Sequence, residues 1–287
     1  MTIPNQPITP DGGCVKFDLM PSTTTPNLVR FTGHNYFRQR ITLSILSGKA
    51  VRIDGIRPDD QNPGLRGELS GANSGLSYQR EYHRDIVYRY LGYFLEPLVA
   101  IGPFSKKPLS LTLKGITSDE KDLSADIIRT VTLPHLTLFG ISDGVELKIK
   151  KRGAAPLGGG EIEFICPVVK QLKTLNFVDP GKIIRIRGIA HAVRVSSDKC
   201  PRMIDSCREV LNRYINDIYL VADVYRKDDS GSFGMSLLAT STTGALHCSE
   251  VIGGAGALPN DIGHAASRSL LSEIRRGGCV DRHHQWM

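Results

Sequence analysis

The stretch V-E-L-K-I-K-K-R-G-A-A-P-L-G-G-G-E-I-E-F-I-C, residues 145–166, decides the fold class of this chain. Apolar and charged residues alternate at its start, which predicts a half-buried strand with Lys148 and Lys150 on a basic outer face. The glycine-rich segment Gly153–Gly160 follows, and the apolar run Glu161–Cys166 predicts a second strand. The stretch therefore predicts a β-hairpin with a long loop.

Helix and strand patterns alternate along the chain before this hairpin. Asp85–Val99 has apolar residues at helical spacing, and Ala125–Leu138 predicts a further helix that contains Pro134. Such alternation is typical of domains in which helices cover a sheet. We therefore predict a mixed α and β (α+β) class. The other elements predicted in this part are a helix around Ile41–Leu46 and strands at Val51–Ile53 and Leu109–Leu113.

From Gly181 onward the predicted order changes to one strand, one helix and three strands, which indicates a second, smaller domain. Its helix begins at Pro201, a favoured first helical residue. Asn260–Arg276 then has an amphipathic pattern with Asn260 as N-cap. We expect this helix to return to the main domain.

The composition is that of a globular protein, since 40% of the 287 residues are hydrophobic and 23% are charged. No apolar run approaches the ~20 residues that span a bilayer, so we exclude a membrane protein. Residues 1–28 lack an apolar core and are expected to be a flexible tail, not a secretory signal. The six cysteines lie at unrelated spacings. They are predicted to be reduced, mostly buried thiols of an intracellular protein.

The formal net charge of +7 is concentrated in one part of the chain. Residues 144–194 contain ten basic and four acidic residues, which accounts for six of the seven net charges. A cluster of this kind indicates a polyphosphate partner such as nucleic acid, although a solvated basic surface is the alternative.

The three consecutive glycines Gly158, Gly159 and Gly160 allow backbone N–H groups to converge on an anion, or another segment to pass close by. The loop lacks the G-K-[S/T] ending of a nucleotide-binding loop. By itself it is weak support for a binding site.

Taken whole, R-G-A-A-P-L-G-G-G-E-I (Arg152–Ile162) resembles the signature of the RNA 3′-terminal phosphate cyclase family. Phe37–Lys49, Ile56–Arg66 and Asp179–Gly188 have counterparts there in the same order. The resemblance extends from about Arg30 to Asp281. It is closest to the cyclase-like branch, nucleolar ribosome-assembly factors that share the fold without its ligase-type chemistry.

The resemblance implies a main domain built from repeats of a two-helix, four-strand unit, interrupted by an inserted α/β domain. The expected segments are a flexible tail at 1–28, the main domain at 29–180, the inserted domain at 181–258 and the return to a truncated main domain at 259–287.

The chain departs from the cyclase pattern in ways that argue against cyclase chemistry. His34 and Asn35 occupy a turn that is glycine-rich in cyclases, and Asp59 and Asp60 stand where cyclases tend to carry basic residues. The C-terminal histidine that cyclases adenylylate has no counterpart. We therefore expect no cyclase activity and no cofactor.

Two segments of the family pattern are expected to be missing, one after Arg66 and one after Asp281. The first and last repeats would then lack strands, which leaves unpaired sheet edges and exposed apolar faces.

Three functions follow from the resemblance and remain open. The leading one is a non-catalytic assembly factor of the small-subunit pre-ribosome in the nucleus and nucleolus. Its expected partners are pre-ribosomal RNA, a large ribosome-assembly GTPase and other pre-ribosome components, with no membrane. The alternatives are an enzyme, either an endoribonuclease acting on pre-ribosomal RNA or a residual cyclase, and an inactive truncated isoform.

The expected site is a surface for RNA or another anion, with no catalytic residue. Its predicted members are Arg38, Arg57, Arg66, Lys148, Lys150, Arg152, Gly158, Gly159, Gly160, Arg185 and Arg187.

The last residues, E-I-R-R-G-G-C-V-D-R-H-H-Q-W-M (273–287), crowd potential metal ligands together, namely Cys279, Asp281, His283 and His284. Ligands so close in sequence cannot surround an ion unaided. The residues after Asp281 also resemble nothing expected there. We interpret them as an aberrant chain end and predict no metal site.

Overall fold

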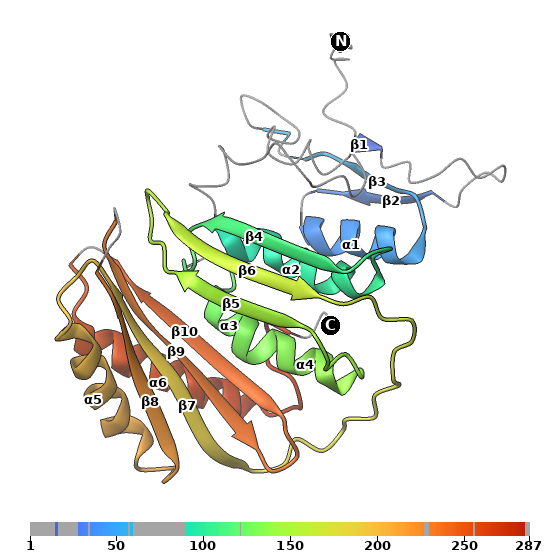
Figure 1. Cartoon of the computed structure of the whole chain (residues 1–287). Helices are drawn as coiled ribbons and strands as arrows, with labels where there is room; N and C mark the ends of the chain where they lie inside the picture. The colour runs from blue at the N-terminus through green and yellow to red at the C-terminus, as the bar shows by residue number, and fades with distance from the viewer. Residues whose placement is uncertain are drawn as a thin grey trace. The chain divides into compact units, whose positions relative to one another are not determined.

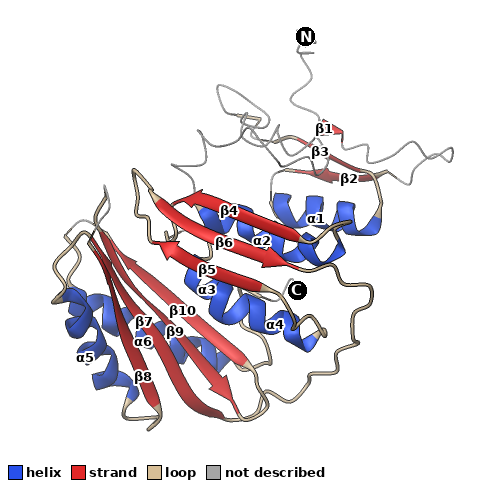
Figure 2. Cartoon of the chain, viewed as in Figure 1, coloured by secondary structure: helices blue, strands red, loops and turns tan. Residues whose placement is uncertain are grey.

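The computed structural model describes residues 15–16, 28–33, 35–56, 58–59, 90–120, 122–226, 230–254 and 256–284. Helices and strands alternate among them (Figure 1, Figure 2), so the predicted mixed α and β class is confirmed. The chain divides into two compact units, residues 1–80 and 81–287, and each is described by itself.

The first unit is a small β-α-β arrangement. Parallel strands β2 and β3 flank helix α1 in sequence, and β1 pairs antiparallel with β3. Apolar residues of β3 and Ile56 form its core. Leu43 on α1 is 63% exposed, so part of this helix has an uncovered apolar surface. The elements are β1 (Val15–Lys16), β2 (Val29–Thr32), α1 (Phe37–Ser47) and β3 (Val51–Asp54).

The second unit begins with a three-stranded antiparallel sheet of order β4-β6-β5, which contains the predicted hairpin. Apolar residues of the helices pack on this sheet around Leu95, Ile128 and Phe164. The elements are α2 (Leu91–Ile101), η3 (Gly102–Phe104), β4 (Leu109–Gly115), α3 (Ala125–Ile127), η4 (Ile128–Thr132), α4 (Leu133–Leu138), β5 (Glu146–Lys151) and β6 (Gly160–Cys166).

The helices of this part agree with the sequence predictions except at one end. α3, the π-helical turn η4 and α4 follow one another directly over the predicted Ala125–Leu138. Helix α2 begins at Leu91, because Tyr90 is extended and forms a bridge with Ile116, while residues 85–89 of the predicted helix lie outside the described part. Residues 60–89 lie outside the described part, so the segment expected to be missing after Arg66 remains a prediction.

A four-stranded sheet of order β10-β9-β7-β8 forms the rest of the second unit. β7 and β8 are parallel because helix α5 connects them, whereas the other neighbours are antiparallel. The predicted order of one strand, one helix and three strands is thus present. The elements are β7 (Ile183–Val193), α5 (Lys199–Leu211), β8 (Ile218–Tyr225), β9 (Ser232–Ser241), β10 (Leu246–Gly253) and α6 (Pro259–Arg276).

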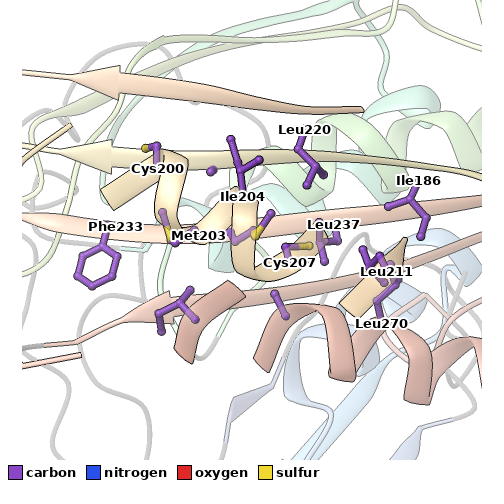
Figure 3. Packing of buried hydrophobic residues seen from close by; sticks show 14 of the residues in the cluster. Ile186, Cys200, Met203, Ile204, Cys207, Leu211, Leu220, Phe233, Leu237 and Leu270 are labelled. Atoms are coloured by element: carbon purple, nitrogen blue, oxygen red, sulfur yellow. The ribbon is translucent and has the colours of Figure 1, made fainter. Parts of the chain in front are cut away.

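Helix α6 packs beside α5 against this same sheet. The sequence analysis assigned Asn260–Arg276 to the main domain, and this division into domains remains a prediction. Met203 of α5, Leu237 of β9 and Leu270 of α6 belong to one buried cluster (Figure 3). The helix also begins one residue earlier than predicted, with Leu258 as N-cap. The boundary at 258/259 therefore separates a helix from the sheet that it covers.

The other face of the β10 edge packs against the 125–138 helix. Cys248 of β10 shares a small buried cluster with Ile127 and Val131. This contact between the two halves of the second unit places polar groups from both of them close together. Within the described residues, no helix is long and apolar enough to cross a bilayer.

Candidate nucleic-acid interface

Arg152, the last basic residue of the hairpin strand, is buried where the two sheets of the second unit meet. Its Nη1 and Nη2 donate to the two carboxylate oxygens of Asp126, at 2.5 and 3.1 Å. Its Nε donates to Asp223 Oδ2 at 2.7 Å, and only 4% of the side chain is exposed. A phosphate could reach Arg152 only by breaking these bonds. The structure thus gives Arg152 a packing role in place of the predicted RNA contact.

The ion pair shifts the pKa values of both partners. Burial would raise the pKa of Asp126, but the adjacent Arg152 outweighs this effect and lowers it. Burial likewise opposes the charged form of Arg152, yet Asp126 and Asp223 raise the pKa of its guanidinium. Both groups are therefore charged, and each depends on the other to remain so in a buried position.

Two more titratable groups lie beside this ion pair. His191 on β7 has its Nε2 3.5 Å from Ser118 Oγ, and burial together with the Arg152 charge lowers its pKa to about 4. Glu250 on β10 accepts a 2.6 Å hydrogen bond from Ser236, and burial raises the pKa of its carboxyl group to about 7. The sequence analysis identified neither residue, because nothing local distinguishes them from ordinary strand residues.

Lys148 and Lys150 lie on the exposed face of β5, as the alternation predicts. That face is not uniformly basic, however. Lys148 Nζ lies 2.8 Å from Glu146 Oε2, and Lys150 Nζ lies 3.2 Å from Glu163 Oε2 on the neighbouring strand. Each lysine thus has a carboxylate beside it, which weakens the field available to attract a phosphate.

Close packing explains Gly160 of the hairpin loop, and positive φ values explain Gly158 and Gly159. A Cβ atom on Gly160 would lie 2.7 Å from both Gly115 O and Gly153 N, so no other residue fits there without moving the backbone. Gly158 N donates to Ala154 O at 2.8 Å and has φ of 73°. Gly159 has φ of 89°. The geometry at Gly160 therefore supports the close passage of another segment.

Arg185 and Arg187 lie on β7, on the side of the four-stranded sheet away from α5 and α6. Arg187 donates to both carboxylate oxygens of Asp217, at 2.7 and 3.1 Å. Arg185 is exposed. Tyr219 on β8 pairs in register with Arg187 and is 60% exposed, with the guanidinium carbon 5.9 Å from its ring centroid. Val221, two residues further along β8, is 42% exposed.

Tyr219 is a candidate that the sequence analysis missed. Its signal was present in the alternation of D-I-Y-L-V-A-D-V-Y, residues 217–225, which places Tyr219 and Val221 on one face. An exposed aromatic ring beside arginines is a platform on which an unpaired base can stack.

The remaining predicted residues belong to the first unit. Arg38 lies in the first turn of α1 and is half-buried. Arg57 and Arg66 lie outside the described residues, as do His34 and Asp60 of the altered cyclase motifs. The structure therefore brings Lys148, Lys150 and Arg152 onto one hairpin, but it leaves the grouping of the others a prediction.

Comparison with known families accounts for this combination of hairpin and sheets. A family model described as RNA 3′-terminal phosphate cyclase matches residues 29–72 and 77–287. The chain belongs to this family. Membership in the cyclase family confirms the resemblance carried by Arg152–Ile162.

Relatives within the cyclase family have cyclase-like names. The RNA 3′-terminal phosphate cyclase-like protein of Homo sapiens is 41% identical over 296 residues, which cover 91% of this chain and 79% of the relative. The rRNA processing protein of Schizosaccharomyces pombe is 37% identical over 292 residues, covering 91% and 80%. That of Saccharomyces cerevisiae is 33% identical over 291 residues, covering 91% and 79%. These similarities confirm the cyclase-like branch.

Proposed function

We propose that this chain is a non-cyclase member of the family that acts in rRNA processing and ribosome biogenesis. The observation that carries the proposal is its similarity, over 91% of its length, to relatives named as rRNA processing proteins. The burial of Arg152 supports it, because the arginine of the family signature holds the fold together here and is not presented to a ligand.

The finer part of the proposal concerns place and partners. The chain acts in the nucleus, in the nucleolar small-subunit pre-ribosome. It is a partner of pre-ribosomal RNA, of a large ribosome-assembly GTPase and of other pre-ribosome components during endonucleolytic cleavage of the RNA. The support for these details is the sequence resemblance to the cyclase-like branch.

The RNA-contact surface in this proposal is the outer face of β7 and β8. Arg185 supplies positive charge there, Arg187 is paired with Asp217 but lies beside the Tyr219 ring, and Tyr219 supplies an exposed ring for base stacking. Lys148 and Lys150 play a smaller part because their neighbouring glutamates repel the RNA backbone. This assignment moves the centre of the predicted surface from the hairpin to the four-stranded sheet.

Replacement of the Schizosaccharomyces pombe relative by this chain tests the proposed function. We expect the full chain to co-sediment with pre-ribosomal particles and to restore processing of pre-ribosomal RNA, followed by hybridisation with probes across the cleavage sites. A chain that stays in the light fractions while the precursors accumulate would instead identify it as the inactive isoform.

A second assay addresses the enzymatic alternatives. Incubation of the full chain with labelled ATP and a divalent metal should leave the protein unlabelled, since the cyclase motifs are altered at His34 and Asn35. Acid-labile label on a histidine would show that cyclase chemistry survives.

A further inference from the structure

Three potential metal ligands from distant parts of the chain converge in the second unit. Cys248 lies on β10, whereas Asp281 and His284 follow α6. Their ligand atoms all lie within 4.8 Å of one another, and all three residues are buried. Val280 forms a bridge with Leu246, which holds this C-terminal segment beside β10. The end of the described chain is therefore part of a packed structure and not a loose tail.

We propose that Cys248, Asp281 and His284 bind a divalent transition metal ion of the zinc type. Tetrahedral zinc with Zn–S of about 2.3 Å and Zn–N of about 2.0 Å separates such donor atoms by about 3.5 Å. Cys248 Sγ is already 3.2 Å from Asp281 Oδ2. Small side-chain adjustments bring the three donors to the spacing that an ion requires.

Groups around the ligands hold them in place, as the outer partners of metal ligands do. Asp281 Oδ1 accepts backbone N–H groups from His283 at 2.8 Å and His284 at 3.1 Å, which fixes the carboxylate. His284 Nε2 lies 2.7 Å from Thr132 Oγ1. Nδ1 of His284 lies 2.8 Å from Asp281 Oδ1. When Nε2 carries the proton and donates to Thr132, Nδ1 offers its lone pair to an ion held between His284 and Asp281.

His135 provides an independent observation. Its ring stacks on that of His284, with centroids 5.2 Å apart and planes 15° apart. Its Nδ1 lies 2.8 Å from Val131 O, and its buried Nε2 has no hydrogen-bond partner. A buried nitrogen without a partner is unfavourable, so the ring beside His284 has an unmet need for a polar or ionic group.

Thr132, His284 and Asp281 also follow one another as a hydroxyl nucleophile, a base and an orienting carboxylate would in a catalytic triad. His284 Nδ1 lies 2.8 Å from Asp281 Oδ1, but Asp281, His284 and Thr132 are 0%, 1% and 0% exposed. A substrate cannot reach a hydroxyl in that position. An ion bound by a thiolate, a carboxylate and an imidazole fits both the burial and the ligand chemistry.

The test is a titration of the purified full chain, first freed of metal with a chelator, with Co²⁺ and separately with Zn²⁺. We expect one equivalent of Co²⁺ to give a thiolate-to-cobalt charge-transfer band and the visible bands of tetrahedral coordination, and Zn²⁺ to displace it. Cys248→Ser should abolish the charge-transfer band. Thr132→Val, which removes no ligand, should weaken binding by about 10–100-fold.

Cys279→Ser and His283→Gln are matched controls, because both residues lie in the same segment but outside the ligand set. They should bind Co²⁺ as the unchanged chain does. A folded chain that gives no cobalt band would overturn the proposal. Equal loss of the band in the control variants and in Cys248→Ser would do the same. Should Cys248→Ser fail to fold, the Thr132→Val titration decides alone.

Discussion

Arg152 Nε donates a 2.7 Å hydrogen bond to Asp223, although 71 residues separate the two along the chain. The same guanidinium binds both oxygens of Asp126, so one side chain connects the hairpin, helix α3 and strand β8. A charge in this position is tolerated only because its partners are present. The arginine at the start of the family signature therefore connects the two sheets through buried ion pairs.

Removal of the Arg152 ion pairs should strongly destabilise the protein. Arg152→Met removes the buried partner of the Asp126 carboxylate and leaves only the partly exposed Arg129 beside it, so we expect a loss of about 3–5 kcal/mol in the free energy of unfolding. Urea denaturation of the full chain measures it. Lys150→Met on the same strand is the control, since its ion pair is exposed and should matter little. Equal stability of the two variants would show that the ion pairs of Arg152 do not hold the two sheets together.

RNA binding should depend on the outer face of the four-stranded sheet. Arg185→Glu combined with Tyr219→Ala should weaken binding to single-stranded pre-ribosomal RNA and reduce the dependence of affinity on salt, because a phosphate contact is lost. Filter binding at several salt concentrations measures both quantities. Lys148→Glu with Lys150→Glu is the comparison pair and should have the smaller effect. The reverse ranking would place the surface on the hairpin.

The buried His191 and the partly exposed Glu250 should have opposing effects on the pH dependence of stability. The pKa of Glu250 is raised from 4.5 to about 7, so its contribution is present below pH 4.5 and is lost as the pH rises towards 7. The pKa of His191 is lowered from 6.5 to about 4. Its contribution is therefore lost as the pH falls from 6.5 towards 4, and the two effects offset each other between pH 4.5 and 6.5.

Glu250→Gln removes the contribution of Glu250 to the pH dependence of stability and leaves that of His191. Relative to the unchanged chain, the free energy of unfolding of this variant should rise with pH by about 1.4 kcal/mol per pH unit between pH 4.5 and 6.5. Denaturation at a series of pH values measures the slope. Parallel curves for the two proteins would mean that Glu250 is ionised throughout this range in the folded state.

Gly160 should not tolerate a side chain. A Cβ atom there would meet backbone atoms of Gly115 and Gly153 at 2.7 Å, so Gly160→Ala should cost about 1–3 kcal/mol through overpacking. Gly254→Ala is the control, because a Cβ atom at Gly254 has no atom within 4 Å. Thermal melting of the two variants compares them. A melting temperature for Gly160→Ala equal to that of the control would contradict the close approach.

Local patterns were sufficient to predict most of the helices and strands. The alternation in residues 145–152 led to β5, and helical spacing led to Ala125–Leu138, because backbone geometry sets these periods over a few residues. Helical spacing did not predict the break at Tyr90, because Tyr90 pairs with Ile116, a contact that no local pattern contains. The surface against which α6 packs could not be predicted for a related reason, since an amphipathic helix does not specify which apolar face it will cover.

The sequence by itself determined the class, the hairpin and the family of this protein, because strand alternation, helical spacing and the glycine-rich signature are all local. Tertiary structure alone decided the roles of the charged and metal-ligand residues. Lys150 gains a partner because the pairing of β5 with β6 places Glu163 diagonally across from it, and Cys248 meets His284 because α6 turns the chain back to β10. Electrostatic energy depends on distance in space and on burial, and neither quantity can be read from separation along the chain.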